Sequence, residues 1–409
     1  MAFPSKVSSD LPRILKTSIW NFFRRTEKPL GILLYLTGDS HWLGGAQYAR
    51  NLILALNMIS PKKCPPVYLR VSRKKDVTGL EAVARQSQVV SLDRLVAKWT
   101  TRGEMTTGWL SDECTVAFPQ KGGQAAGRPM DIHWIPDFQY KHYPQFFTEE
   151  ERRNRDDLYE QLLQSCRLLV LSSKSAQTDF RTFFPKYRHL PVEVLPFHAI
   201  LEEDDLTPDP GQALQHRNLP GRFLYCANQM WQHKGHDVLF EALALLRDQG
   251  LVIPLVSTGS PEDYRTDAFR QSILAKIQVL NLESQITFLG VVPRREQIQV
   301  YRQASLLVQP SRFEGWSTTV EEARTLHKPI VLSDIPTHRE QAPPTGSFFH
   351  CGDPVSLAGV LGEKWREILA APPAQSHGAV LLADNIKRGR FYAQKFIAIC
   401  QKAHDIATR

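Results

Sequence analysis

Two glutamates, Glu314 and Glu322, flank a segment of seven residues that combines a turn with the start of a helix. Residues 306–308 are apolar, as is typical of the end of a buried strand, and the glycine after Glu314 suits a tight turn. Thr318, followed three positions later by Glu321, forms a capping-box pattern. The pattern predicts that a helix begins near Thr318.

The chemistry expected of this segment is the binding of a diphosphate that carries hydroxyl-rich groups at both ends. The backbone N–H groups of residues 317–320 would point into the crevice at the strand ends, where a helix N-terminus favours a phosphate. Glu314 would precede this terminus, and Glu322 would follow it by about one turn. Each carboxylate could then accept hydrogen bonds from a sugar.

The segment resembles the E-x7-E motif of retaining glycosyltransferases of family 4, which have the GT-B fold. Three further segments match the family in the same order: Gly44-Gly45 after the first predicted strand, NQMWQHKG at residues 228–235, and ITFLG at residues 286–290. Together they extend the resemblance over most of the chain. It implies an α/β protein with two Rossmann-like parallel-sheet domains facing a central cleft, and sugar transfer from a nucleotide-diphosphate donor with retention of configuration.

The composition is that of a globular protein. With 409 residues, 42% of them hydrophobic and 22% charged, the chain suits two domains of about 200 residues each. No apolar run approaches the roughly 20 residues that cross a bilayer, and the N-terminus lacks the features of a signal peptide. We therefore expect a cytoplasmic location, either free or at the inner face of the membrane. Six scattered cysteines predict neither disulfides nor a zinc site, and we expect them to be reduced and mostly buried.

Residues 1–28 form a basic N-terminal segment. Between residues 11 and 28, apolar side chains recur at helical spacing and five of the six charged residues are basic. This pattern favours a helix on an anionic membrane surface as much as a terminal helix packed on its own domain. The net charge of +8 also favours anionic partners, without choosing between nucleotides, lipids and nucleic acid.

Residues 29–200 alternate between strand and helix patterns and predict the first, acceptor-side domain. The predicted elements are strands at 31–37, 66–71, 88–91, 115–118, 131–135, 168–172 and 192–196, and helices at 46–58 and 149–164. Residues 38–45 and the glycine-rich residues 121–128 are predicted loops.

The second predicted domain, at residues 201–379, is expected to bind the donor. An acidic, proline-containing segment at 198–221 is the predicted linker, and the strand and helix patterns of this domain follow it. Its elements are strands at 222–227, 253–258, 286–289 and 306–309, and helices at 236–249, 267–280 and 295–304. Alternation of this kind implies a parallel sheet covered on both faces. An amphipathic helix at 380–404 ends the chain, and the resemblance implies that residues 380–409 return to the first domain.

Lys234 is the leading candidate for stabilising the departing diphosphate, because it follows the first strand of the second domain at the carboxyl edge of the sheet. No D-x-D stands where a metal-dependent enzyme would need one, so we expect neither a metal ion nor a cofactor. The family usually has an arginine where this chain has Gln229, although a similar subgroup has N-Q-F-W-x-H-K. Part of the phosphate grip would then come from Arg312 or from the helix terminus. The alternative is that Lys234 is an ordinary solvated lysine.

The resemblance also implies roles for the remaining donor-side residues. Glu314 would be catalytic and would contact the sugar together with the amides of Gly315 and Trp316, and Glu322 would bind the ribose. Ser317 and Thr318 would face the phosphates, while Gly259 and Gly290 would approach the base. The alternative for Glu322 is an ordinary acid in the first turn of a helix, with Glu321 as the better capping partner.

The first domain offers two candidate loops. Gly44 and Gly45 would allow a phosphate or sugar to approach the backbone, or they are simply turn residues. The loop at residues 133–142 would place a polar residue near the transferred sugar, and it offers His133, Asp137 and Gln139 among others. We choose Asp137 as the catalytic candidate because it follows the strand end directly.

The sequence excludes some rival functions and leaves others open. No G-x-G-x-x-G follows a strand and no P-loop is present, which disfavours a dehydrogenase or a P-loop enzyme. A GT-B sugar-nucleotide epimerase and a catalytically idle subunit that binds a membrane or partner remain alternatives. The expected partners are a nucleotide-diphosphate sugar and a glycan, lipid-linked or small-molecule acceptor, with no nucleic acid.

Overall fold

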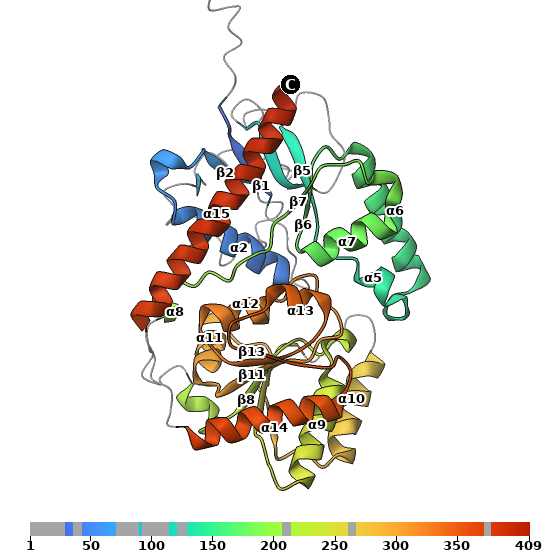
Figure 1. Ribbon diagram of the computed structural model, residues 1–409, viewed down its shortest axis with the longest axis vertical. Coiled ribbons are helices and arrows are strands. Elements are labelled where there is room, and N and C mark those ends of the chain that lie inside the picture. Colours follow the sequence, from blue (N-terminus) through green and yellow to red (C-terminus); the bar gives the residue numbers. More distant parts are fainter. Residues whose placement is uncertain are drawn as a thin grey trace, which may run out of the picture.

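The computed structural model describes residues 29–35, 43–70, 90–91, 114–120, 129–206, 214–260, 267–371 and 378–409. They form two parallel β-sheets with flanking helices, one sheet in each half of the molecule (Figure 1). The predicted α/β class with two parallel-sheet units is therefore confirmed. The predicted basic helix at residues 11–28 and the predicted loop at residues 121–128 lie outside the described residues.

The N-terminal half contains a seven-stranded sheet in the order β3-β2-β1-β4-β5-β6-β7, in which every pairing is parallel. Its strands are β1 Ile32–Tyr35, β2 Val67–Arg70, β3 Val90–Ser91, β4 Val116–Gln120, β5 Met130–Ile135, β6 Leu169–Leu171 and β7 Val192–Val194. Its helices are α2 Leu43–Asn57, α5 Gln139–His142, α6 Glu149–Ser165, α7 Lys174–Phe183 and α8 Glu203–Leu206. Central strands such as β1 and β6 are apolar along their whole length because both faces of the sheet are covered.

The C-terminal half contains a six-stranded parallel sheet in the order β10-β9-β8-β11-β12-β13. Its strands are β8 Leu224–Ala227, β9 Leu255–Thr258, β10 Ile286–Phe288, β11 Leu306–Gln309, β12 Ile330–Ser333 and β13 Gly346–Phe349. Its helices are α9 His236–Asp248, α10 Asp267–Val279, α11 Arg294–Gln303, α12 Thr318–Thr325, α13 Pro336–Gln341 and α14 Pro354–Ala370. The strands and helices predicted in this half up to β11 all occur, and their ends differ from the predicted ones by at most two residues.

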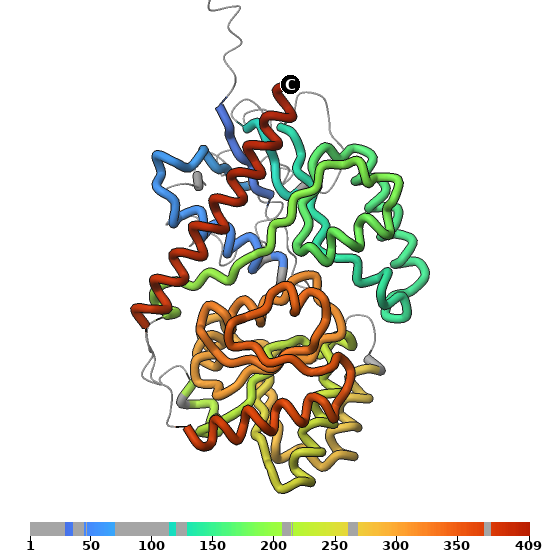
Figure 2. The backbone as a smooth tube through the Cα atoms, in the orientation of Figure 1, coloured from blue at the N-terminus to red at the C-terminus, as the bar shows by residue number. Residues whose placement is uncertain are grey.

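The final helix, α15 (Gly378–Thr408), belongs to the C-terminal part of the sequence but packs on the N-terminal sheet (Figure 2). Tyr392, Phe396 and Cys400 share a buried core with strand β1 and helix α2. A Cβ on Gly389 would lie 2.2 Å from the Met58 sulfur, so this position requires glycine for close packing. None of the helices described is long and apolar enough to span a bilayer.

One expectation about a loop was wrong. Helix α2 begins at Leu43, so Gly44 and Gly45 lie in its first turn instead of in the preceding loop. Within the predicted linker at residues 198–221, Ala199, Ile200 and Leu201 are at most 1% exposed and are therefore core residues. Residues 207–213 of this segment lie outside the described residues. All six cysteines are free, and four of them are buried, as expected.

Three buried histidines, His133, His236 and His338, predict acid sensitivity. Burial lowers the pKa of each imidazole to about 4, whereas in the unfolded chain each would titrate near 6.5. Between these values the unfolded state binds more protons, so stability falls as pH drops from about 6.5 toward 4, by up to about 1.4 kcal/mol per pH unit for each histidine. Chemical denaturation across this pH range measures the slope.

His133 provides the matched variant for this prediction. It is fully buried, and neither ring nitrogen has a hydrogen-bond partner in the described structure. His133→Leu should therefore stabilise the protein at pH 5 by about 1–3 kcal/mol. It removes an unsatisfied polar group, and it also removes one of the three groups that take up a proton on unfolding at this pH. An unchanged pH slope in this variant would contradict the assignment.

Candidate active site

A cavity of about 300 Å³ lies between the two halves of the molecule, at the carboxyl ends of both sheets. This is a volume at the lower end of the range for small-molecule sites. The N-terminal half contributes Tyr48, Trp134, Pro136, Asp137, Gln139, Ser172 and Phe197. The C-terminal half contributes Ala227, Asn228, Gln229, Trp231, His233, Lys234, Thr258, Gly259, Gln297, Phe313, Glu314, Gly315, Trp316 and Thr318.

Lys234 and Glu314 form an ion pair in this cavity. Lys234 Nζ lies 2.8 Å from Glu314 Oε1, and the two side chains are 16% and 9% exposed. Burial pushes the pKa of Glu314 upward, but the Lys234 ammonium and the neighbouring groups outweigh it and hold that pKa below its usual value. The turn after Lys234 depends on Gly235, whose φ is +72° and whose Cβ would lie 2.1 Å from Pro310 O. The pair is thus a fixed, partly desolvated charge site.

A chain of amides holds Glu314 in place. Gln309, the last residue of β11, donates from Nε2 to Glu314 Oε1 at 2.8 Å. Its own Oε1 accepts from Asn228 Nδ2 at 3.0 Å. Thr337 Oγ1 donates to the backbone carbonyl of Glu314 at 2.7 Å. Glu314 is therefore oriented from the ends of two adjacent strands and from α13.

The start of α12 differs from the predicted capping box. Ser317 is the N-cap, and its Oγ accepts from Val320 N at 3.4 Å, whereas Glu321 turns away into a buried network. The N–H of Ser317 is also occupied, since it donates to Gln341 Oε1. Of the four amides expected to be free, only those of Thr318 and Thr319 lack a partner among the described residues. Thr318 lines the cavity. The start of α12 therefore offers fewer backbone N–H groups to an anion than predicted.

Gln229 lies in the cavity wall, but Arg312 does not compensate for its lack of charge. The guanidinium of Arg312 bonds to both carboxylate oxygens of Asp237, at 2.8 and 2.6 Å. This bidentate pair fixes Arg312 against α9, and Arg312 is not among the described residues that line the cavity. The expectation that it could grip a phosphate is corrected. Lys234 is the cavity's cation among the described lining residues.

Glu322 lies behind the cavity wall and is 4% exposed. Its carboxylate is paired with Arg294 from the start of α11, with an N–O distance of 2.5 Å. Burial and the neighbouring Glu322 carboxylate raise the pKa of Tyr301 well above its usual value. A ribose could reach Glu322 only by sharing or displacing Arg294, a partner that the sequence did not predict.

The two glycines expected near the base are not equivalent. Gly259 lines the cavity at the end of β9, with φ +126° and no room for a Cβ because Asn228 O would lie 2.4 Å away. Gly290 accepts a hydrogen bond from the Gly259 N–H at 2.9 Å. It is not among the described lining residues, so it supports the loop from behind.

The loop at residues 310–317, between β11 and α12, is here called the donor-side loop because of the role predicted for it. It contacts the N-terminal half directly. A Cβ on Gly315 would lie 2.6 Å from Pro136 O and 2.7 Å from the Asp137 Cβ. Burial raises the pKa of Asp137, although its Oδ1 accepts the Gln139 N–H at 2.9 Å. Both Asp137 and Gln139 line the cavity. Of the polar candidates in the 133–142 loop, these two face the site.

His133 does not reach the cavity, and the aromatic residue beside it does. Successive strand residues point to opposite faces, so His133 enters the core while Trp134 lines the cavity. Trp134 stacks on Tyr48 with ring centroids 4.4 Å apart and donates from Nε1 to Ser172 Oγ at 3.1 Å. Period-two alternation along β5 could have revealed this, whereas the placement of Tyr48 and Ser172 required the fold.

Two facing parallel α/β sheets with a cavity at their carboxyl ends define the GT-B class of glycosyltransferase folds. A solved glycosyltransferase from Rickettsia africae ESF-5 has the same fold, with a TM-score of 0.62 and 12% identity over 92% of this chain and 98% of that one. HepE of Anabaena in complex with UDP and glucose aligns with a TM-score of 0.58 and 14% identity over 92% of this chain and 99% of that one. At these identities the likeness establishes the fold.

Residues 215–366, in the C-terminal half, match the family model of glycosyl transferases, group 1. A curated relative, the lipopolysaccharide core biosynthesis mannosyltransferase LpcC of Rhizobium leguminosarum bv. viciae, is 33% identical over 124 residues. That match covers 30% of this chain and 34% of the relative. The chain thus spans about a third of the length of this relative.

Proposed function

We propose that the chain is a retaining glycosyltransferase that moves a sugar from a nucleotide-diphosphate donor to a hydroxyl group without a metal ion. The observation that carries the proposal is the Lys234–Glu314 pair, which lies in the same cavity as the start of α12. A fixed cation and the amide of Thr318, which has no partner among the described residues, form a site that complements the negative charge of a departing diphosphate. The group 1 family match of residues 215–366 supports the same assignment.

In this proposal each side of the cavity has its own task. Lys234 neutralises charge on the leaving phosphate, and Glu314 with the Gly315 and Trp316 amides holds the transferred sugar. Asp137 and Gln139 approach that sugar from the opposite wall. Retention would follow a front-face route in which the leaving phosphate itself accepts the proton of the acceptor hydroxyl. No separate side-chain base is then required.

For the acceptor, we favour a lipid-linked or envelope glycan over a small metabolite. The name of LpcC, a lipopolysaccharide core mannosyltransferase, supports this choice. The positive charge of residues 11–28 also supports it, since a basic amphipathic segment would hold the protein at the inner, anionic face of a membrane. Sedimentation with anionic liposomes, with and without residues 1–28, tests the membrane contact, and equal sedimentation of both forms would remove it.

A panel of UDP-glucose, UDP-N-acetylglucosamine, GDP-mannose and ADP-glucose tests the enzymatic assignment. Each is incubated with the protein and followed by NMR, with and without simple glycoside acceptors. A retaining glycosyltransferase releases a nucleoside diphosphate and forms a product with the anomeric configuration of the donor, whereas an inverted product would contradict retention. A new nucleotide sugar without diphosphate release would indicate an epimerase instead. No reaction and no binding across the panel would favour an idle subunit.

A further inference from the structure

The segment at residues 197–201, here called the crossing segment, follows the last N-terminal strand and is held by side chains from three helices or loops. Trp316, in the donor-side loop, donates from Nε1 to Phe197 O at 2.9 Å, and Thr325 of α12 donates to Ala199 O at 2.8 Å. From the N-terminal half, Asn51 of α2 accepts the Ile200 N–H at 3.1 Å. The crossing segment is thus bonded to both halves of the molecule.

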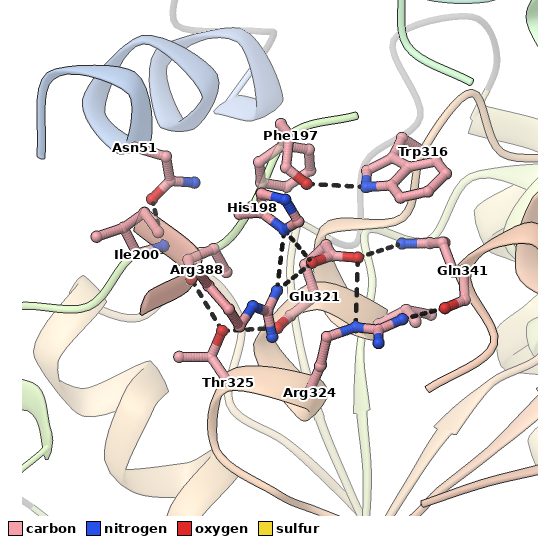
Figure 3. A network of polar contacts seen from close by, with 12 residues as sticks. Asn51, Phe197, His198, Ile200, Trp316, Glu321, Arg324, Thr325, Gln341 and Arg388 are labelled. Carbon is pink, nitrogen blue, oxygen red and sulfur yellow. Dashed lines mark hydrogen bonds and ion pairs between the residues drawn. The ribbon is translucent and has the colours of Figure 1, made fainter. Parts of the chain in front are cut away.

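Helix α15 completes this grip. Asn385 accepts the N–H of Leu201 at 3.1 Å and donates to its carbonyl at 2.8 Å. One turn further along α15, Arg388 reaches toward α12, where it forms an ion pair with Glu321. The long final helix therefore contacts the crossing segment and the donor-side helix at the same place (Figure 3).

Glu321 is the centre of this junction. Its side chain is 1% exposed, yet it is surrounded by basic and polar groups from different elements. His198 Nδ1 lies 3.3 Å from Oε2, and Arg388 Nη2 bonds to the same oxygen. Oε1 faces Arg324 Nε at 3.8 Å and accepts from Gln341 Nε2 at 3.2 Å. Burial raises the pKa of Glu321, but these partners outweigh it and hold the pKa below its usual value.

Gln341 connects this carboxylate to the cavity. It accepts the N–H of Ser317 at 3.2 Å and donates to the Ser317 carbonyl at 3.0 Å, in addition to its bond to Glu321. Ser317 caps α12, and the next residue, Thr318, lines the cavity. The position of the phosphate-facing amides thus depends on a junction whose other members lie on the crossing segment and α15.

A merely local role for Glu321 does not account for these contacts. The cap of α12 is made by Ser317, without Glu321. Burial of a carboxylate and a guanidinium is costly, and an apolar pair of similar size would stabilise the fold as well or better. What an apolar pair would lack is directional contact between α12, the crossing segment and α15.

We propose that Glu321 is a positioning residue for sugar transfer, which holds the donor-side loop in register with the N-terminal wall of the cavity through Arg388, His198 and Gln341. The inference rests on the proposed glycosyltransferase function and adds to it a residue that touches no substrate. A displacement of about 1 Å in such a site lowers the rate by about 100-fold. The effect should fall on kcat, because the loop and Lys234 remain available to bind the donor.

The test compares the paired variant Glu321→Gln/Arg388→Met with a matched control, Arg50→Met/Glu202→Gln. The control removes another ion pair, between α2 and the residue after the crossing segment, that does not touch α12. The paired replacement avoids leaving a buried arginine unpaired. Donor turnover is measured with the nucleotide sugar that the wild-type protein consumes fastest in the panel above, together with the melting midpoint.

We expect the Glu321→Gln/Arg388→Met variant to melt near the wild-type temperature and to lose about 100-fold in kcat, with a donor KM within about threefold. The control should keep wild-type kcat. Arg388→Lys, which keeps the charge, should restore part of the lost kcat, and it serves as the folded variant if the paired one unfolds. Wild-type kcat in the folded Glu321→Gln/Arg388→Met variant, or in Arg388→Lys if the paired variant unfolds, would overturn the role of Glu321. Absence of turnover in the wild-type protein would instead overturn the proposed function.

Discussion

Replacing Lys234 with methionine is expected to lower kcat/KM for sugar transfer by about 10³-fold, while the fold persists. The substitution keeps most of the side chain's length and removes the charge that we propose faces the leaving diphosphate. Loss of one preorganised group of this kind costs about 10²–10³ in rate. Gln229 and Arg312 cannot replace it, because Gln229 is neutral and Arg312 is bound to Asp237. Steady-state kinetics with the preferred nucleotide sugar measure the effect.

Lys276→Met is the matched control for this variant. Lys276 also pairs with a glutamate, Glu241, but the pair joins α9 and α10 away from the cavity. We expect it to keep wild-type kinetics. Lys234→Met also leaves Glu314 without its cation, so the Glu314 pKa should rise toward its usual value or above. A Lys234→Met enzyme with kcat/KM within threefold of wild type would contradict the assignment of Lys234 to the diphosphate.

Changing Glu322 to glutamine is expected to cost about 3 kcal/mol of stability, whatever the function of this residue. The reason is Arg294, which would be left unpaired; we take the lower end of the range for a broken buried pair because a quarter of its side chain is exposed. The paired variant Glu322→Gln/Arg294→Met removes both charges and should recover most of this loss. Chemical denaturation of the two variants measures the difference.

The paired variant then separates ribose binding from structural support. If Glu322 accepts hydrogen bonds from the ribose, the wild-type protein should bind a nucleoside diphosphate about 10–100-fold more tightly than its 2′,3′-dideoxy analogue. The Glu322→Gln/Arg294→Met variant should bind the two with similar affinity. Discrimination that survives in this variant would mean that Glu322 serves only to balance Arg294.

The alternation of strands and helices could be predicted because it rests on local patterns. Both sheets are parallel and buried, so strands such as β8 and β11 are short apolar runs followed by loops with glycine or polar residues. The proximity of Lys234 and Glu314 could also be predicted from the parallel arrangement of the strands. They follow adjacent strands whose carboxyl ends must meet at one edge.

The predictions for Glu321 and Arg312 were wrong because each side chain binds a partner that is distant in the sequence. Thr318 with Glu321 satisfies a capping pattern, but Ser317 is an equally good cap, and Glu321 is taken by Arg388, which is 67 residues away in the sequence. The sequence allowed Arg312 to bind a phosphate, but in the fold its guanidinium binds the Asp237 carboxylate. Such partners belong to the tertiary structure and leave no local signal.

We propose that the cavity holds a nucleotide-diphosphate donor with its phosphates at Lys234 and the start of α12. Calorimetric titration with UDP, GDP, ADP and dTDP, each beside its monophosphate, tests it most directly. We predict that at least one diphosphate binds at least tenfold more tightly than its monophosphate, and that Lys234→Met abolishes this preference. Equal affinity for mono- and diphosphates, or a preference that survives in Lys234→Met, would contradict it.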